Sequence, residues 1–252
     1  MEHTKNITRR LWTNRLVYWG VCLLAGLTAV PLLAILGEVL VRGWQQFSWE
    51  FFTEPTPTAF KAMKAVAAGE TIPGGIANGI IGTMLMLGMA TAFAVPVGIL
   101  CGIYLAENGK KRFAIIVSYL TDLLQGTPSV IIGIITYIWV VVPMKGYSAI
   151  AGSVALFIMM LPLIIRSTEE TMKILPASLK EAGLALGGNY ARVVLKVQLP
   201  AAFGGIFTGV LLAVSRVIGE TAPLMFTALG CSLIRWDVDK PIAAVPLLIW
   251  EF

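Results

Sequence analysis

The sequence predicts an all-α membrane protein with several spans, and its composition, its apolar runs and its chain length support this prediction. Of its 252 residues, 57% are hydrophobic and only 13% are charged, whereas a soluble domain usually carries about 25% charged residues. Apolar runs lie near residues 16–41, 76–106, 113–143, 147–166 and 201–231. Each is close to or above the roughly 20 residues that a helix needs to cross the hydrocarbon core. Helices are expected because backbone groups in lipid must hydrogen-bond within their own segment.

A polar leader, residues 1–15, precedes the first run and carries four Lys and Arg residues. A signal peptide would begin in the same way. The run over residues 16–41 is, however, longer than the roughly 7–15 residues of a cleaved signal core. We therefore expect it to be retained as the first transmembrane helix.

Charge asymmetry between the loops predicts the orientation of the chain. If successive loops lie on alternating sides, twelve Lys and Arg residues fall on the side of the N-terminus and six on the other. Loops with more Lys and Arg usually face the cytoplasm, so we expect a cytoplasmic N-terminus. Residues 42–75 then form an external loop, residues 76–231 form the core, and residues 232–252 form an external segment whose apolar end is too short to cross.

The third run contains a polar patch around a proline. Pro128 lacks a backbone N–H and breaks the helical hydrogen-bond ladder, and Thr127 and Ser129 flank it. Broken helices often hold substrate sites in transporters, and hydroxyls with freed N–H groups suit an oxyanion. Thr127 and Ser129 are therefore candidates for a substrate path. The open alternative is a structural kink in which the hydroxyls bond back to the helix.

The fifth run contains an arginine, Arg216, followed by Glu220 and Thr221. An arginine in mid-span costs at least about 2.5–3.5 kcal/mol to insert, so it should face a partner or a polar path. A spacing of four places Glu220 on the same helical face, where the two charges would neutralise each other. A guanidinium also matches two oxygens of a phosphate group, and Thr221 adds a hydroxyl. The alternative is an ion pair that only fixes helix packing.

Small residues at four-residue spacing occur in two of the runs. They are Ala94, Gly98 and Gly102 in the second run and Gly205 and Gly209 in the fifth. Such ridges let helix backbones approach closely. We expect these residues to pack helices against one another rather than to bind a ligand.

A polar stretch, residues 173–200, separates the fourth and fifth runs. It is too polar to span, yet it contains helix formers on both sides of Gly187-Gly188. Paired glycines favour a turn. We therefore expect two short helices joined by a glycine turn, on the cytoplasmic side of the membrane.

Several function classes are excluded by the composition. The net charge of +5 does not indicate nucleic-acid binding, because the basic residues form short clusters between apolar runs. The three isolated cysteines and the single histidine show no metal-ligand spacing, so no metal site is expected. The nucleotide-binding pattern GxxxxGK[ST] does not occur, and no nucleophile–base pair of an enzyme is visible. ATP-driven transport would need a separate ATPase subunit.

The polar stretch resembles a known family. Glu181-Ala182-Gly183 is followed after three residues by Gly187, and after nine more by Val197-Gln198-Leu199-Pro200. This pattern resembles the EAA loop of binding-protein-dependent importer permeases, which reads EAA, three residues, G, nine residues, I-x-L-P. Gly183 replaces the second Ala of the pattern, which would loosen the helix by up to about 1 kcal/mol, and Val197 replaces Ile.

Four further runs narrow the resemblance to the A-type permeases of the Pst phosphate importers. They are Gly102–Glu107, Pro128–Gly133, Ile164–Glu169 and Arg216–Leu224. The RxIGETAP pattern in the last run points to phosphate, and to the A-type permease rather than its C-type partner. The resemblance covers the chain from about Phe52 to its end.

The resemblance implies a helical bundle of the type I ABC importer permease class with six spans, of which the sixth would be missing at the C-terminus. It implies a coupling helix that docks on the ATPase through Glu181, Ala182, Gly183, Gly187, Leu199 and Pro200. The implied partners are a second, PstC-like permease, a PstB-like dimer that binds ATP and Mg, and an external PstS-like phosphate-binding protein. This chain would bind no cofactor, and the complex would lie in the bacterial cytoplasmic (inner) membrane.

Three other functions stay open at this point. The chain could be a permease for another oxyanion such as sulfate or phosphonate, which competition in uptake assays would reveal. It could be a secondary transporter or channel, which would not co-purify with a nucleotide-binding subunit. It could also be a receptor or scaffold that senses phosphate, which would show no flux in reconstituted vesicles.

Overall fold

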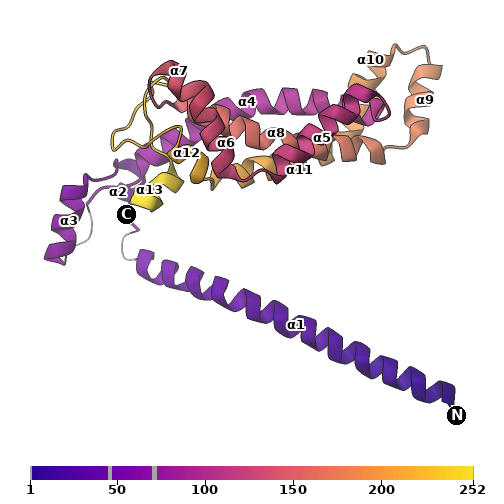
Figure 1. Cartoon of the computed structure of the whole chain (residues 1–252), viewed down its shortest axis with the longest axis horizontal. Helices are drawn as coiled ribbons and strands as arrows, with labels where there is room; N and C mark the ends of the chain where they lie inside the picture. The colour runs from indigo at the N-terminus through magenta and orange to yellow at the C-terminus, as the bar shows by residue number, and fades with distance from the viewer. Residues whose placement is uncertain (1, 45–46, 70–72, 252) are drawn as a thin grey trace. The chain divides into compact units, whose positions relative to one another are not determined.

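The computed structural model describes residues 2–44, 47–69 and 73–251 of the chain. The chain divides into two compact units, Met1–Phe51 and Phe52–Phe252. The first unit consists mainly of one long helix, α1 (Glu2–Gly43). The second unit is a helical bundle, and it contains all the residues for which the sequence predicts a function (Figure 1).

The regular elements of the described residues are helices, which confirms the predicted all-α class; the only β pairing among them is a single bridge between Leu229 and Ile242. After α1 the helices are α2 (Trp49–Thr53), α3 (Ala59–Ala68), α4 (Ala77–Asn108), α5 (Arg112–Gly126), α6 (Ser129–Thr136), the π-helical turn η2 (Tyr137–Val141), α7 (Val142–Met144), α8 (Ala149–Ile174), α9 (Ala177–Ala185), α10 (Tyr190–Val193), the π-helical turn η3 (Val194–Gln198), α11 (Leu199–Ile218), α12 (Ala222–Met225) and α13 (Val245–Glu251).

Four helices among the described residues are long and apolar enough to cross a membrane. They cover Arg10–Gly43, Ala77–Asn108, Ala149–Ile174 and Tyr190–Ile218, and the pair α5 and α6–α7 makes a fifth if it counts as one span. The first, second and fourth predicted spans are thus present as helices. The fourth is longer than expected, because α8 continues from residue 166 to Ile174.

The third predicted span, residues 113–143, is present as two helices separated by a break. Two helices, Arg112–Gly126 and Ser129–Met144, meet at an angle of 107°. The residue before a proline is disfavoured in the α conformation, and Thr127 accordingly has an extended backbone with φ −75° and ψ 131°. Pro128 continues the extended segment before α6 begins. The helix break itself was expected at Pro128, but not its sharpness.

The predicted bounds of the fifth span, residues 201–231, are also wrong. The helix begins at Tyr190 and ends at Ile218. Pro200 does not start it, because α10 and the π-helical turn η3 precede this proline and the Leu199 N–H donates to the Val194 carbonyl. A wider turn fits here because a proline ring clashes with the carbonyl four residues earlier. The same pattern recurs where η2 precedes Pro143.

The bundle is organised around α8, which packs against α4 and against α11 (Figure 1). Glycines make these approaches possible. A Cβ atom on Gly102 would lie 2.6 Å from Thr168 Cβ, and one on Gly205 would lie 2.5 Å from Thr171 Cγ2. Both contacts are far too close for a real side chain, so the backbones approach where side chains are absent. The predicted packing role of the small residues is confirmed.

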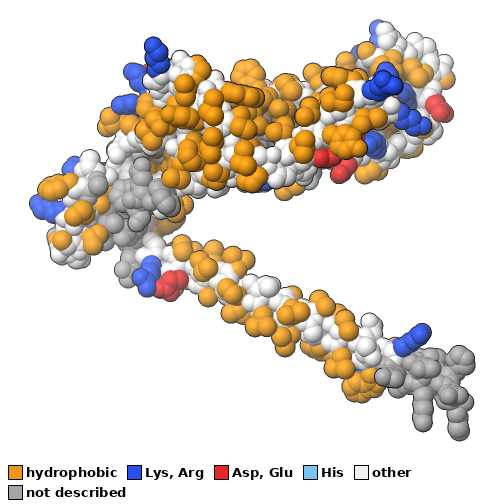
Figure 2. Space-filling model, in the orientation of Figure 1, with side chains coloured by type: hydrophobic (Ala, Val, Ile, Leu, Met, Phe, Trp, Pro, Cys, Tyr) orange, Lys and Arg blue, Asp and Glu red, His pale blue; other side chains and the backbone are white. Residues whose placement is uncertain are grey.

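The surface of the bundle has the pattern of a membrane protein. Figure 2 shows hydrophobic side chains over the middle of the bundle on the visible face, with Lys, Arg, Asp and Glu side chains gathered toward its two ends. Large apolar side chains such as Phe93, Phe203 and Leu212 are more than half exposed. A contiguous apolar band of this kind needs lipid or another protein around it.

One end of the bundle carries α9 and α10, and the other carries α6, α7 and α12 (Figure 1). At the latter end, buried Asn78 in the first turn of α4 joins two loops. Its Oδ1 accepts hydrogen bonds from the Thr56 N–H at 3.1 Å and the Thr56 hydroxyl at 2.7 Å, and its Nδ2 donates to the Cys231 carbonyl at 2.7 Å. Residues 226–244 are therefore held against the start of α4.

The same segment, residues 226–244, completes the N-terminus of α8. The N–H of Ala149 donates to the Lys240 carbonyl at 3.2 Å, and the N–H of Ile150 donates to the Val238 carbonyl at 3.0 Å. The first N–H groups of a helix have no partner within the helix. The segment after α12 is therefore part of the fold and not a loose connection.

A pair of substitutions on α4 tests the glycine-mediated packing. Replacing Gly102 with Ala is expected to destabilise the protein by about 1–3 kcal/mol, because overpacking forces backbones apart, and the Ile165 carbonyl lies only 2.7 Å from the new Cβ. Replacing Gly88 with Ala, where a Cβ meets nothing within 4 Å, should stabilise the protein by up to about 1 kcal/mol through helix propensity. Thermal unfolding in detergent measures both, and equal melting temperatures for the two variants would contradict this packing.

Candidate functional site

The loop between α8 and α10, residues 175–189 and called here the α9 loop, is the most distinctive feature of one end of the bundle. Helix α9 ends where Gly187 adopts φ +78°, a left-handed conformation that glycine adopts at no steric cost. The Asn189 side chain then caps α10 by accepting a hydrogen bond from the Ala191 N–H at 3.2 Å. The predicted pair of helices with a glycine turn is confirmed, except that the second helix continues through η3 into α11.

Two glycines fit the α9 loop around one valine of α10. A Cβ on Gly183 would lie 2.8 Å from Val193 Cγ1, and a Cβ on Gly188 would lie 2.9 Å from Val193 Cγ2. The Gly188 N–H also donates to the Gly183 carbonyl at 3.2 Å. Gly183, which departs from the EAA pattern, therefore has a local reason: it makes room for Val193.

The outer face of the α9 loop is open. Glu181, Ala182 and Gly187 are exposed, which a docking role would require. Sequence reasoning missed Leu186, whose side chain is 90% exposed at the tip of the loop. An unsupported leucine next to the glycine turn was the available signal, because exposed apolar side chains in a loop suit a partner surface.

The other three predicted docking residues do not lie on the outer face of the α9 loop. Gly183 is half-buried, since it faces Val193. Leu199 and Pro200 lie in the first turn of α11, after η3, and do not belong to the α9 loop. The spacing of the EAA pattern therefore spans two parts of the structure, an exposed loop and the start of a membrane-length helix.

The inner face of the α9 loop is tied to the last turn of α4. The Lys180 ammonium donates a hydrogen bond to the Glu107 carboxylate and lies 5.0 Å from the centre of the Tyr190 ring. The Gln198 Nε2 donates to the same carboxylate at 3.4 Å. The hydrogen bond to Glu107 raises the pKa of Lys180 above its ordinary value, while burial acts against this rise.

A second ion cluster joins α5 to α8 near the same end of the bundle. Arg166 Nε donates to Asp122 Oδ1 at 3.0 Å, and Nη1 donates to Glu169 Oε2 at 2.6 Å. Lys173 Nζ donates to the other oxygen of Glu169, also at 2.6 Å. Two cations and two carboxylates balance, which explains how the buried Glu169 is accommodated. A pocket of about 350 Å³ opens beside the cluster.

The structure places Arg216 close to the end of a helix. It lies in the last turn of α11, two residues before the helix ends, and its side chain is exposed. Helix Tyr190–Ile218 has 29 residues and is therefore about 43 Å long, longer than the roughly 30 Å hydrocarbon core. Within this helix, Gly205 lies next to Thr171 of α8 and Gly209 lies next to Ser167. Arg216, seven residues further along α11, therefore lies beside the apolar part of α8. A cation at this position also complements the partial negative charge of a helix C-terminus.

The predicted ion pair between Arg216 and Glu220 is wrong. The helix ends at Ile218, and Gly219 leaves helical geometry with φ −90° and ψ 3°. Glu220 is therefore not on the helical face of Arg216, because a spacing of four aligns residues only while a helix continues. Within the described residues, no carboxylate oxygen lies within 4.0 Å of the Arg216 guanidinium.

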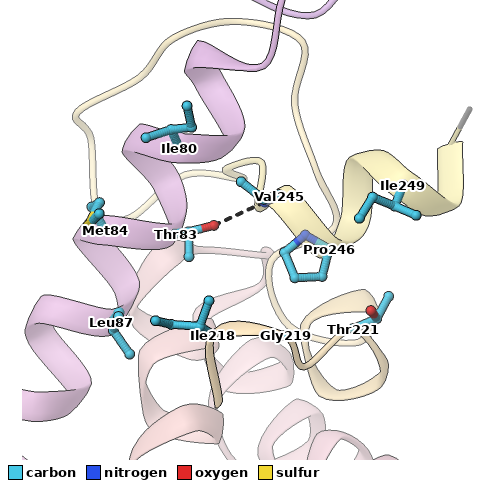
Figure 3. Close-up of a pocket in the computed structure, with 10 residues that line it drawn as sticks. All are labelled: Ile80, Thr83, Met84, Leu87, Ile218, Gly219, Thr221, Val245, Pro246 and Ile249. Carbon is cyan, nitrogen blue, oxygen red and sulfur yellow. Dashed lines mark hydrogen bonds between the residues drawn. The ribbon is translucent and has the colours of Figure 1, made fainter. Parts of the chain in front are cut away.

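Thr221 lies in a separate, largely apolar pocket of about 370 Å³ (Figure 3). The walls come from α4, the end of α11, the residues after it and the start of α13. The ten lining residues are Ile80, Thr83, Met84, Leu87, Ile218, Gly219, Thr221, Val245, Pro246 and Ile249. The Val245 N–H donates to Thr83 Oγ1 at 3.0 Å. Arg216 and Glu220 do not line this pocket, so the three predicted residues do not form one site in this chain.

Helix α6, which follows the break in the third run, contacts the segment after α11. A Cβ on Gly133 of α6 would lie 2.8 Å from Pro223 Cα of α12, so two of the sequence runs that carry the resemblance pack directly together. The Thr127 hydroxyl, however, donates to the Leu123 carbonyl at 2.7 Å. This geometry matches the alternative of a hydroxyl bonded back to its helix. Ser129 is half-buried at the start of α6.

Several known proteins are similar in sequence to this chain. The sequence pattern of the family "Binding-protein-dependent transport system inner membrane component" matches residues 98–244, a range that includes the α9 loop. Among similar proteins, the phosphate transport system permease protein PstA of Yersinia pestis is 39% identical over 222 residues, which cover 88% of this chain and 72% of that protein. The PstA protein of Haemophilus influenzae is 38% identical over 86% of this chain and 74% of its own length. PstA 1 of Mycobacterium tuberculosis is 32% identical over 88% and 71%.

The contact between Gly183 and Val193 predicts a coupled mutational effect. Replacing Gly183 with Ala restores the EAA pattern and gains up to about 1 kcal/mol of helix propensity, but the clash with Val193 costs about 1–3 kcal/mol. Hydrogen exchange of the α9 loop should therefore be faster or unchanged in this variant. In a Val193→Ala background, which removes the obstructing methyl groups, the same substitution should slow it. Slower exchange with Val193 intact would show that the two residues are not in contact.

Proposed function

We propose a function for this chain, which belongs to the family of binding-protein-dependent transport system inner membrane components. It is the membrane permease subunit of an ATP-driven importer that carries inorganic phosphate into a bacterial cell. The observation that carries this conclusion is a similarity of up to 39% over 88% of the chain to proteins named as PstA phosphate permeases. The membrane-length helices and the exposed α9 loop are the parts that such a subunit needs.

The α9 loop is the proposed contact with the ATPase. Its exposed face presents Glu181, Ala182 and Leu186 at one end of the bundle. The chain contains no GxxxxGK[ST] loop, so a separate subunit must hold ATP and Mg. Binding of ATP by that subunit would displace the loop and move the bundle between inward-open and outward-open states. This assignment places the α9 loop, and with it the N-terminus, in the cytoplasm.

Other subunits complete the proposed importer. A second, homologous permease would pair with this chain, and the ATP-binding subunit would be present as a dimer. An external phosphate-binding protein would deliver the substrate to the mouth between the two permeases. The family description supports the last of these, because it names transport systems that depend on a binding protein.

Arg216 is the proposed contact with phosphate along the path. Its exposed guanidinium at the end of α11 can present two parallel N–H donors to a phosphate oxygen pair. Thr127 and Ser129, at the break between α5 and α6, are the next candidates, and Thr127 would have to release its hydroxyl from Leu123 to donate to a ligand. The separate positions of Thr221 and Glu220 give them a weaker claim to the same path.

The similar proteins weigh against the remaining functions. Their names specify phosphate, which favours phosphate over sulfate or phosphonate as the substrate. The family description names a transport-system component, which disfavours an ATP-independent transporter and a receptor without flux.

The role of Arg216 is tested by substitution in the assembled importer. Replacing it with Gln should reduce phosphate uptake at least about tenfold, since a hydrogen bond to a charged group contributes about 1.5–3 kcal/mol. The ATPase should still co-purify, and Arg216→Lys, which keeps the charge but not the planar fork, should fall between. Lys240→Gln removes an exposed cation at the opposite end of the bundle from α9 and serves as control. Uptake by Arg216→Gln equal to that of this control would remove Arg216 from the path.

Docking through the α9 loop is tested at its tip. Leu186→Asp or Glu181→Lys should weaken retention of the ATPase about fivefold or more, because residues at the centre of an interface often contribute over about 1 kcal/mol. Leu233→Asp alters an exposed leucine outside the loop, whose exposed fraction is 59%, and should have no effect on retention. Co-purification of the ATPase from membranes measures the retention. Full retention by both loop variants would rule out docking through this face.

A further inference from the structure

We propose that Glu107 is a positioning residue that locks the α9 loop to the end of α4, so that displacement of the loop is transmitted to α4. The transport consequence of this inference rests on the proposed function, whereas the lock itself does not. Glu107 lies in the last turn of α4, 73 residues before its partner Lys180 in the sequence. Nothing in the proposed contacts with phosphate or with the ATPase uses it.

Glu107 joins both halves of the α9 region to one point. Its Oε2 accepts a hydrogen bond from Lys180 on α9, and its Oε1 accepts one from Gln198 Nε2 at 3.4 Å, in the turn that leads into α11. The segment entering the loop and the segment leaving it thus converge on the same carboxylate. The Tyr190 ring, 5.0 Å from the Lys180 ammonium, covers the lysine from the α10 side.

The connection between α8 and α9 does not by itself fix the orientation of the α9 loop. Helix α8 ends at Ile174, and Leu175 and Pro176 connect it to α9 through extended backbone. The proline ring fixes φ of Pro176 and restricts Leu175 to extended conformations, so α9 can turn relative to α8 mainly by rotation about ψ of Pro176. The bond from Lys180 to Glu107 adds a constraint to the packing of α9 against Val193, and it attaches α9 to α4 rather than to its neighbour α8.

Two adjacent residues of α9 face different surroundings. Lys180 is directed inward to α4, and only 29% of its side chain is exposed, while Glu181 is exposed on the outer face. A helix places consecutive residues about 100° apart, so one turn can hold a partner on one side and the bundle on the other. The loop can therefore be loaded from outside at Glu181 while Lys180 passes the displacement inward.

Helix α4 is suited to carry a displacement across the bundle. It is a single helix of 32 residues, about 48 Å long. Its far end contains Asn78, which is bonded to Thr56 and to the Cys231 carbonyl. The lock at Glu107 and the junction at Asn78 therefore lie at the two ends of one helix.

The Glu107–Lys180 pair should matter more than an exposed ion pair. The side chain of Glu107 is only 14% exposed and that of Lys180 is 29% exposed, whereas Asp237 and Lys240, which also form an ion pair, are 60% and 54% exposed. Water and salt screen the second pair far more than the first. The Asp237–Lys240 pair thus provides a matched control at the opposite end of the bundle from α9.

The lock is tested by charge reversal in the assembled importer. Glu107→Lys places two cations together and should increase the rate of chymotrypsin cleavage within the α9 loop at least about fivefold. This increase is larger than the loss of an exposed ion pair would give and smaller than the loss of a fully buried pair would give. The double variant Glu107→Lys with Lys180→Glu restores opposite charges and should return the rate to within about twofold of the original. Glu107→Gln, which keeps the shape of the side chain, should give a smaller increase, and Asp237→Asn none.

The same variants separate positioning from mere stability. Per complex that retains its ATPase, Glu107→Lys should raise the ATP hydrolysed for each phosphate imported, and the double variant should restore this ratio. Unchanged cleavage in both Glu107→Lys and Glu107→Gln, or no recovery in the double variant, would overturn the lock. Faster cleavage with an unchanged ATP-to-phosphate ratio would overturn its role in transmitting displacement. Absence of phosphate import by the unmodified complex would instead overturn the proposed function, while the cleavage result would still decide the lock.

Discussion

The close approach of α8 to α4 and α11 is the constraint on which the rest of the bundle depends. In lipid there is little hydrophobic drive between helices, so association relies on tight packing and interhelical polar contacts. Gly102 and Gly205 provide the tight packing on two sides of α8, and the cluster around Arg166 adds a polar contact to α5. Because α8 is fixed on all these sides, its ends define where the α9 loop leaves the bundle and where residues 226–244 must return.

Proline and glycine explain where the regular helices stop. Pro128 turns the third run through 107°, and the π-helical turns η2 and η3 accommodate Pro143 and Pro200 without ending their helices. Gly187, in the left-handed region, ends α9. The residues for which we propose a function therefore lie at or near the ends and breaks of helices.

The sequence predicted the helical class, the regions of the spans and the form of the α9 loop, because hydropathy and glycine spacing are local properties. It could not locate the end of α11, since the apolar run continues past Gly219 and average hydropathy does not register a helix terminus. The pairing of Arg216 with Glu220 failed for the same reason. Contacts such as Glu107 with Lys180 join residues far apart in sequence, and no periodicity reveals them.

The position of the charged clusters indicates where the membrane ends. The apolar part of α8, from Ala149 to the residue before Arg166, has 17 residues and is about 26 Å long, close to the roughly 30 Å thickness of the hydrocarbon core. Arg166, Glu169 and Lys173 then fall at the membrane boundary, where a neutral ion cluster is tolerated. Glu107 lies at the same end of the bundle and leads directly to the α9 loop. The charged residues of α8 thus set the depth of the bundle in the membrane. The bond between Glu107 and Lys180 holds the α9 loop just outside the lipid, where a water-soluble partner can reach it.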